Sequence, residues 1–515
     1  MVTATIRKHA AYVAERWKFY SLFFIFALVV AVRLYFAFQT PEFSDDSSYF
    51  VLKQIEHIRE TGLPILETER NTGDMLLFPP AYYYVLSFFT FFMPATIAAK
   101  VVPNIFAATT IFLVYLLSMR FTRNQNASLF AATLSGFIPV FFLQTFNSIS
   151  IFTLVVPLVL LSFYAFLMIG TSDKYIGVYI FSVIILSFTH PAVFFVVLGQ
   201  IIYFIFVKVE GLQYKNVEQE VIIVSLFIVL WSQFLIFKNA FLFHGPSIIW
   251  QNAPTQILSQ YFRSITIVES IALIGIIPTF AGVSMFFQYV RDRKSKFMFF
   301  FLSYAMPLFI LLWMQLIRPM AGLILLSSVL IVVLSKYYQN LTGFIEKTKF
   351  SRFKTVIIIG VLLMVYLTSV SPTFALMNEK INDAPSQEKV QLLRWMKNSS
   401  KESEMIMAPY QEAFFVEYYS GRSTVLNMNF LMVQNVDQVV DDIREFYTTY
   451  SLIDAIQILD RYDVDYVYIS DSVLTRYGVQ SLRVAENDQC FEELFAGQSK
   501  NKIYEVTCSL QSVEA

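Results

Sequence analysis

Long apolar runs alternate with short polar segments along the first 371 residues of the chain. A bilayer core about 30 Å thick is crossed by about 20 apolar residues of helix, and eleven runs approach this length. They lie at residues 19–38, 101–119, 127–146, 151–169, 175–189, 191–207, 221–237, 265–289, 297–316, 319–335 and 355–371. The pattern predicts a polytopic α-helical membrane domain, residues 1–371, with about eleven transmembrane helices.

The lysines and arginines between these runs indicate how the helices are oriented. With a cytoplasmic N-terminus, 18 of them fall in cytoplasmic segments and 7 in external loops, in agreement with the positive-inside rule. The strongest cytoplasmic markers are RDRKSK at 291–296 and KTKFSRFK at 347–354. An odd number of spans then places the C-terminal part outside. We therefore expect a multi-pass protein of the cell membrane with an extracytoplasmic C-terminal domain.

The segment between the first two runs, residues 39–99, is expected to form a large first external loop. Its apolar stretch 75–95 would be a twelfth span only if Arg120 and Arg123 were placed outside, and Pro79-Pro80 disfavours a regular helix start. We expect this stretch to be a juxtamembrane or re-entrant element. Upstream of it, residues 47–61 have the spacing of an amphipathic helix lying on the membrane, with a solvated polar face. That face carries Lys53, Glu56, His57 and Glu60.

After residue 371 the pattern changes to short alternating elements. Helices are predicted at 385–398, 410–420, 436–449 and 451–461, and strands at 404–408, 423–427, 464–470 and 502–507. This alternation predicts an external α/β domain with a mainly parallel sheet over residues 372–515. Both cysteines of the chain, Cys490 and Cys508, lie in this part. They fit either one disulfide or two reduced thiols.

Composition supports a membrane protein and excludes several other classes. Hydrophobic residues make up 56% of the chain and charged residues 15%, against about 25% charged in a typical soluble protein. The net charge of the whole chain is zero, and a chain that is not polybasic is not expected to have a nucleic-acid partner. This total combines −10 from residue 372 onward with +10 before it. The chain has no GxxxxGK[ST] and no HExxH motif, which disfavours nucleotide and zinc hydrolysis. Arg33 and Glu269 are the clear charges within spans, too few for an ion pathway at mid-depth.

Eight of the 16 acidic residues that precede the C-terminal part lie in the first external loop. Among them, Asp45 and Asp46 follow the first span within a few residues. A cap at the start of the helix 47–61 is one explanation for the pair. A general base that acts on a lipid-borne substrate at the outer surface is the other.

The order of short motifs in the first 170 residues resembles the GT-C superfamily of polyprenyl-phosphate-dependent membrane glycosyltransferases. These motifs are FSDDSSYF, an amphipathic helix ending in TGLP, FPPAYYYVLSFF, a span ending in Arg120 and a further span ending near TFNSISIF. The superfamily includes protein O-mannosyltransferases, aminoarabinose transferases and oligosaccharyltransferase catalytic subunits. The resemblance implies a sugar transferred from a polyprenyl (dolichyl or undecaprenyl) phosphate donor to a hydroxyl of a lipid, glycan or protein acceptor, by an inverting mechanism.

By the same resemblance, Asp45 matches the catalytic acid of the first loop, with Asp46 beside it. Arg318 is the first candidate for the donor phosphate, and Arg263 and Lys238 are the second; cations that reach for lipid headgroups are the alternative for all three. Candidates for acceptor or substrate contacts are His190, His244, Glu269 and Tyr82. For His190, a histidine satisfied within the core is the alternative.

Two departures from the resemblance narrow the expected reaction. Oligosaccharyltransferases carry a DxE-type acidic motif in the second external loop, whereas residues 146–150 here read FNSIS. Without that motif, a Mg²⁺ or Mn²⁺ site is disfavoured. In place of their WWDYG motif, residues 408–412 read APYQE, which disfavours asparagine-linked transfer. A non-catalytic GT-C relative and a lipid or glycan transporter remain as alternatives.

Overall fold

The computed structural model divides into two compact units. Their residues are described except for 1, 66, 70–72, 76–77, 246–256, 258–261, 263–264, 293–294, 430, 432, 434, 487–488, 497–500 and 511–515. The helical unit comprises Met1–Thr40, Ile58–Asn239 and Leu258–Asn382, and the C-terminal unit comprises Pro41–His57, Ala240–Ile257 and Asp383–Ala515. This division differs from the predicted boundary at 371/372, because the last helix of the helical unit continues to Asn382. It also assigns Pro41–His57, part of the predicted first external loop, to the C-terminal unit.

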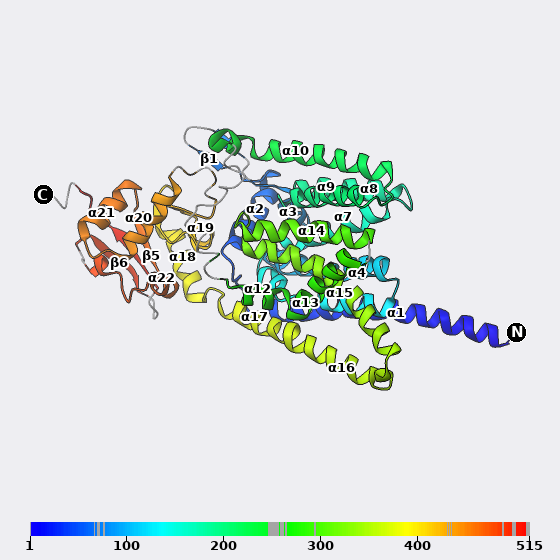
Figure 1. The fold of residues 1–515 in the computed structure, drawn as a ribbon. Helices are drawn as coiled ribbons and strands as arrows, with labels where there is room; N and C mark the ends of the chain where they lie inside the picture. The colour runs from blue at the N-terminus through cyan, green and yellow to red at the C-terminus, as the bar shows by residue number, and fades with distance from the viewer. Residues whose placement is uncertain are drawn as a thin grey trace. The chain divides into compact units, whose positions relative to one another are not determined.

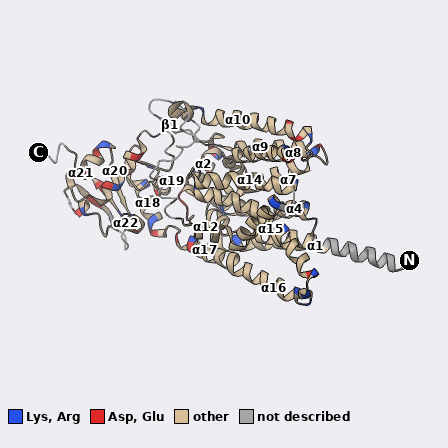
Figure 2. Ribbon diagram, in the orientation of Figure 1, with Lys and Arg blue, Asp and Glu red and all other residues tan. Residues whose placement is uncertain are grey.

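The helical unit is built from long apolar helices, several of which run side by side in Figure 1. Its elements are α1 (Val2–Ala37), β1 (Glu67–Glu69), β2 (Gly73–Met75), α3 (Ala81–Phe89), α4 (Ala95–Thr122), α5 (Gln125–Ser135), α6 (Pro139–Thr145), α7 (Phe152–Met168), α8 (Lys174–Ser187), α9 (Val193–Val209), α10 (Asn216–His244, which ends in the C-terminal unit), α12 (Ile267–Ile274), α13 (Ile276–Asp292), α14 (Lys296–Trp313), α15 (Pro319–Lys347), η2 (Lys349–Phe353), α16 (Lys354–Val365), η3 (Tyr366–Val370) and α17 (Ser371–Asn382). Figure 2 shows that lysine, arginine, aspartate and glutamate are scarce along the middle of these helices and concentrate near their ends.

Ten of the apolar runs that the sequence predicted as spans each coincide with one of these helices or with a bent pair, and the run 355–371 covers α16, η3 and the start of α17. Within the described residues, six helices are long and apolar enough to cross a membrane, or eight if the bent pairs α5–α6 and α12–α13 each count as one span. Three shorter apolar helices, α7, α8 and α9, coincide with the other predicted spans. The total of eleven stays a prediction. The stretch 75–95 contains α3, whose nine residues are too few to cross a bilayer.

Packing inside the helical unit depends on small residues and on two buried cations. A Cβ at Gly199 of α9 would lie 2.1 Å from the Tyr304 ring of α14, so glycine is what allows these helices to approach closely. Arg33 of α1, only 1% exposed, donates from Nε to Asn104 at 2.8 Å and from Nη2 to the Thr145 carbonyl at 3.0 Å. Lys100 donates to the Ala37 carbonyl at 2.8 Å. These bonds connect α1 to α4 and α6, which explains Arg33 as a structural residue.

The C-terminal unit contains a five-stranded sheet flanked by helices. In addition to most of α2 (Ser47–Thr61), its elements are α18 (Gln387–Ser399), β3 (Met405–Met407), α19 (Ala413–Ser420), β4 (Ser423–Thr424), α20 (Val436–Thr448), α21 (Leu452–Arg461), β5 (Tyr466–Ile469), α22 (Asp471–Tyr477), η5 (Arg483–Glu486), β6 (Phe491–Ala496) and β7 (Lys502–Val506). The strand order is β4-β3-β5-β7-β6. The pairings of β3 with β4 and β5 are parallel, whereas β7 pairs antiparallel with β5 and β6.

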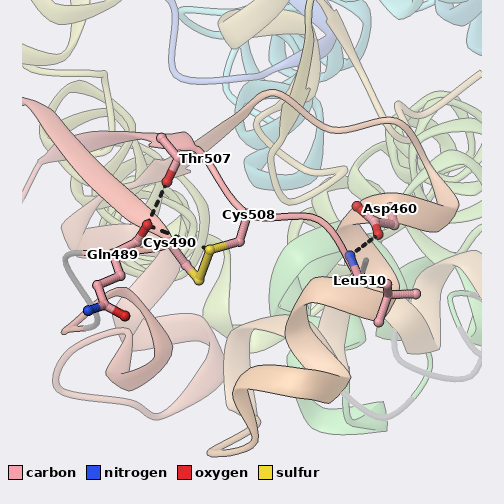
Figure 3. Close-up of a disulfide and its surroundings, with 6 residues drawn as sticks. All are labelled: Asp460, Gln489, Cys490, Thr507, Cys508 and Leu510. Carbon is pink, nitrogen blue, oxygen red and sulfur yellow. Dashed lines mark hydrogen bonds between the residues drawn. A yellow bond between two sulfur atoms is a disulfide. The ribbon is translucent and has the colours of Figure 1, made fainter. Parts of the chain in front are cut away.

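The sheet is therefore mixed, and the prediction of a mainly parallel sheet was wrong. β6, which was not predicted, forms a hairpin with β7, and consecutive strands joined without a crossover helix pair antiparallel. Cys490 and Cys508 form a disulfide that links the start of β6 to the residues after β7 (Figure 3). Around it, Thr507 donates its hydroxyl to the Gln489 carbonyl at 2.9 Å, and the Leu510 amide donates to Asp460 of α21 at 2.7 Å. Of the two alternatives left open for the cysteines, the structure contains the disulfide.

Candidate functional site

Tyr82, His190 and Arg318 come from three distant parts of the sequence and are linked through neighbouring residues at helix ends of the helical unit. Tyr82 lies in the first turn of α3 and is buried. Its hydroxyl donates to the Ser150 carbonyl at 3.0 Å and lies 3.1 Å from the Thr153 hydroxyl in the first turn of α7. Phe152, which precedes Thr153 in α7, has its ring centroid 5.2 Å from that of His190. We call Tyr82, Phe152, His190 and Arg318 the helix-end cluster.

His190 lies in the turn between α8 and α9, and its surroundings determine its protonation state. Burial lowers the pKa of His190 to about 4, and the positive charge of Arg318 lowers it as well. The ring is therefore neutral near pH 7. Its Nδ1 accepts a hydrogen bond from the Ala192 amide at 2.9 Å, so the single ring proton is assigned to Nε2. His190 is thus a neutral N–H donor within the electrostatic reach of Arg318, an exposed residue that directly precedes α15.

The adjacent carboxylates Asp45 and Asp46 belong to the C-terminal unit and have different surroundings. Asp46 accepts backbone N–H bonds from Phe415 at 2.8 Å and Phe414 at 3.2 Å, in the first turn of α19. It therefore caps a helix that lies 368 residues away in the sequence. Burial raises the pKa of Asp46, and these two bonds oppose the shift. Asp45 is partly exposed and accepts a hydrogen bond from the Ser47 hydroxyl. A cap was one of the two explanations that the sequence allowed for the pair, but at the start of α2 and not of α19.

Glu42 is an acid of the same segment that the sequence analysis did not single out. It is 6% exposed, and its Oε2 accepts from the Tyr419 hydroxyl at 2.5 Å and the Tyr49 hydroxyl at 3.3 Å. No local signal separates Glu42 from the other acids of the segment, because Tyr419 is 377 residues away. Its role follows from the tertiary fold alone.

Solved structures provide the comparison that identifies the fold. No protein-family model matches the chain, and no curated protein matches it in sequence. The oligosaccharyltransferase of Archaeoglobus fulgidus in its apo form superposes with a TM-score of 0.62 at 13% identity, covering 94% of this chain and 74% of that one. ArnT from Cupriavidus metallidurans bound to undecaprenyl phosphate superposes with a TM-score of 0.54 at 10% identity, covering 94% of this chain and 98% of that one.

This chain has the fold of the GT-C membrane glycosyltransferases. The arabinofuranosyltransferase AftD from Mycobacteria has the same likeness, with a TM-score of 0.53 at 13% identity, covering 95% of this chain and 40% of that one. At these identities the comparison establishes the fold and leaves the activity to be argued from the residues.

The remaining candidates have local surroundings in this GT-C fold. Glu269 forms a capping box with Thr266 at the start of α12, accepting from the Thr266 amide at 2.7 Å. Ring Nε2 of His244, at the end of α10, lies 2.5 Å from the Leu431 carbonyl. Lys238 is exposed on α10. Arg263 lies outside the described residues.

The described acids of this chain do not compose a divalent-metal site. Among the residues that the structure describes, no group of three or more His, Cys, Asp or Glu side chains is placed to hold an ion. The Asp46 oxygens accept from backbone amides and a Glu42 oxygen accepts from tyrosine hydroxyls, whereas a hard cation needs several such oxygens for itself. Residues 146–150 add no carboxylate. The donor set therefore does not fit a Mg²⁺ or Mn²⁺ ion.

Proposed function

We propose that this protein is an inverting glycosyltransferase that transfers a sugar from a polyprenyl-phosphate donor to a hydroxyl group of a lipid, glycan or protein. The GT-C fold supports the general class, since similar structures include an oligosaccharyltransferase with bound dolichol-phosphate and ArnT with bound undecaprenyl phosphate. The observation that carries the proposal is Asp45, a partly exposed carboxylate that follows α1 by a few residues.

In the proposed mechanism, Asp45 is the general base. Its carboxylate removes the proton of the acceptor hydroxyl while the acceptor oxygen attacks the anomeric carbon of the donor sugar. The bond between that carbon and the phosphate oxygen breaks on the opposite face, so the configuration inverts and polyprenyl phosphate departs as the anion. Because phosphate is a good leaving group, one base and cationic stabilisation of the phosphate are sufficient chemistry.

We assign the donor phosphate to Arg318, with the Nε2–H of His190 as a neighbouring neutral donor. Arg318→Ala is expected to raise the KM for the lipid-linked donor at least about tenfold, because a charge-assisted phosphate contact is lost. Arg318→Lys is expected to recover part of the loss, because lysine keeps the charge but not the two-pronged geometry. Initial rates against donor concentration measure both. The matched control is Arg59→Ala, an exposed cation of α2; an unchanged KM in Arg318→Ala would contradict the assignment.

We further propose that the C-terminal unit acts outside the cytoplasm. The disulfide between Cys490 and Cys508 supports this location, because such bonds persist in oxidising compartments. The excess of lysine and arginine in the predicted cytoplasmic loops supports a cytoplasmic N-terminus. The acceptor would then be reached at the outer face of the membrane.

A non-catalytic GT-C relative is the second candidate, and the cap formed by Asp46 favours it, because one acid of the pair has a structural role. An assay distinguishes the glycosyltransferase from the non-catalytic relative. Membranes that contain the protein are incubated with polyprenyl phosphate linked to a radiolabelled sugar. The proposed function predicts label in an acceptor fraction only where the wild-type chain is present. Retention of all label in the donor, across a panel of donor sugars, would favour the non-catalytic relative.

A further inference from the structure

The polar face of α2 contacts α19 within the C-terminal unit. The Lys53 Nζ lies 3.6 Å from Glu417, and the Tyr418 hydroxyl donates to Glu56 at 3.0 Å. The Phe50 and Phe414 rings lie 4.9 Å apart. The sequence pattern predicted that Lys53 and Glu56 are solvated on a helix lying on the membrane. Glu56 is only partly exposed because it contacts α19, whereas the Lys53 side chain stays 46% exposed beside Glu417.

Two acids anchor the segment that leads into α2, and both bind α19. Asp46 binds the first-turn amides of α19, which have no partner within their own helix and favour a negative charge. Glu42 binds Tyr419 in the last turn of the same helix. The ring of Tyr49, which is 1% exposed, lies 5.1 Å from Phe415 and 5.8 Å from Tyr419 and fills the space between the anchors.

Asp45 lies between these anchors in the sequence. It directly precedes Asp46 and follows Glu42 by three residues, so a chain held at 42 and 46 leaves little freedom for the backbone at 45. The Ser48 and Tyr49 amides also donate to the Asp45 and Asp46 carbonyls, both at 3.0 Å, which fixes the turn that starts α2. The backbone that carries the Asp45 side chain is therefore held in place by its contacts with α19.

We propose that Asp46 and Glu42 are positioning residues through which α19 of the C-terminal unit holds Asp45 in the orientation needed for proton abstraction. This inference rests on the proposed function, in which Asp45 is the base. Effective proton transfer requires placement within hydrogen-bond reach, and a displacement of about 1 Å can cost about 10²-fold in rate. In this account the C-terminal unit supplies the base, Asp45, and also α19, the helix that orients it.

The test compares Asp46→Asn with Asp46→Ala in the full-length chain, reconstituted in nanodiscs. Asparagine keeps an acceptor oxygen and caps helices about as well as aspartate, whereas alanine removes the cap. Asp46→Asn is expected to keep kcat within about threefold of wild type, because the cap remains. Asp46→Ala is expected to lower kcat by about tenfold or more with little change in the donor KM. Glu60→Ala, at an exposed position of α2, is the matched control.

A second measurement, hydrogen exchange at the amides of Phe414 and Phe415, separates positioning from catalysis. Exchange is expected to be slow in wild type, Asp46→Asn and Asp45→Asn, and faster in Asp46→Ala. If Asp46→Asn is as inactive as Asp45→Asn while the amides stay protected, Asp46 itself is the base and the positioning role is overturned.

Two further outcomes keep this inference apart from the proposed function. Full transfer by Asp46→Ala with exposed amides would overturn the positioning role and leave the glycosyltransferase proposal intact. Absence of transfer by the wild-type chain, with the amides protected, would overturn the proposed function, and the positioning role with it.

Discussion

Replacement of Asp45 by asparagine is expected to lower kcat for sugar transfer by about 10²–10⁴-fold, the range that general base catalysis contributes. Asparagine has the same shape and can accept the hydrogen bond from Ser47, but it cannot take the proton of the acceptor hydroxyl. Because Asp46 and Glu42 still hold the segment, the fold is expected to be unchanged. The donor KM is expected to stay within about threefold of wild type, since the phosphate is assigned to Arg318.

Initial rates of transfer from a polyprenyl-phosphate sugar, measured with reconstituted protein, give both constants for Asp45→Asn. Glu60→Gln is the matched control, because it also neutralises an acid but at an exposed position of α2. It is expected to transfer sugar like wild type. Wild-type kcat in Asp45→Asn would remove Asp45 from the mechanism.

Removal of the disulfide is the second large effect. The double variant Cys490→Ser/Cys508→Ser is expected to lower the free energy of unfolding of the C-terminal unit by about 3 kcal/mol. The bond closes a loop between residues 18 apart and thereby restricts the unfolded chain. It also holds the hairpin β6–β7 at one edge of the sheet, where β6 has a single neighbouring strand.

Chemical unfolding of the purified full-length chain, followed by hydrogen exchange at the amides of β5 and β7, measures this loss. Wild type treated with reductant is expected to match the double variant, and reductant is expected to leave the variant unchanged. Equal unfolding midpoints for oxidised and reduced wild type would show that the bond does not stabilise the unit.

Much of the fold could be predicted from the sequence because its signals are local. Apolar runs of membrane-spanning length place the helices of the first 371 residues, and short periodic patterns place most elements of the C-terminal unit. The hairpin partner β6 was missed because FEELFA does not alternate clearly, and with it the mixed character of the sheet. The bends at α5–α6 and α12–α13 fall at Pro139, which opens α6, and at Gly275, whose φ is +106°; a hydropathy pattern contains neither feature.

The candidate site depends more strongly on tertiary structure. Tyr82, His190 and Arg318 could be proposed one by one from their positions near predicted helix ends. The contacts of Tyr82 with Thr153 and of Phe152 with His190, and the effect of Arg318 on the pKa of His190, appear only in the fold. The roles of Asp46 and Glu42 depend on partners more than 360 residues away. Sequence patterns could therefore nominate the acid pair but could not assign separate roles to its two members.

The most direct test of the central claim is the fate of a donor incubated with the purified wild-type chain in nanodiscs. The donor is polyprenyl phosphate linked to a ¹³C-labelled sugar, and a hydroxyl acceptor is supplied. Mass spectrometry and NMR follow the label and its anomeric configuration. The account predicts equal amounts of free polyprenyl phosphate and glycosylated acceptor, with the anomeric configuration inverted. An intact donor, or a product with retained configuration, would contradict it.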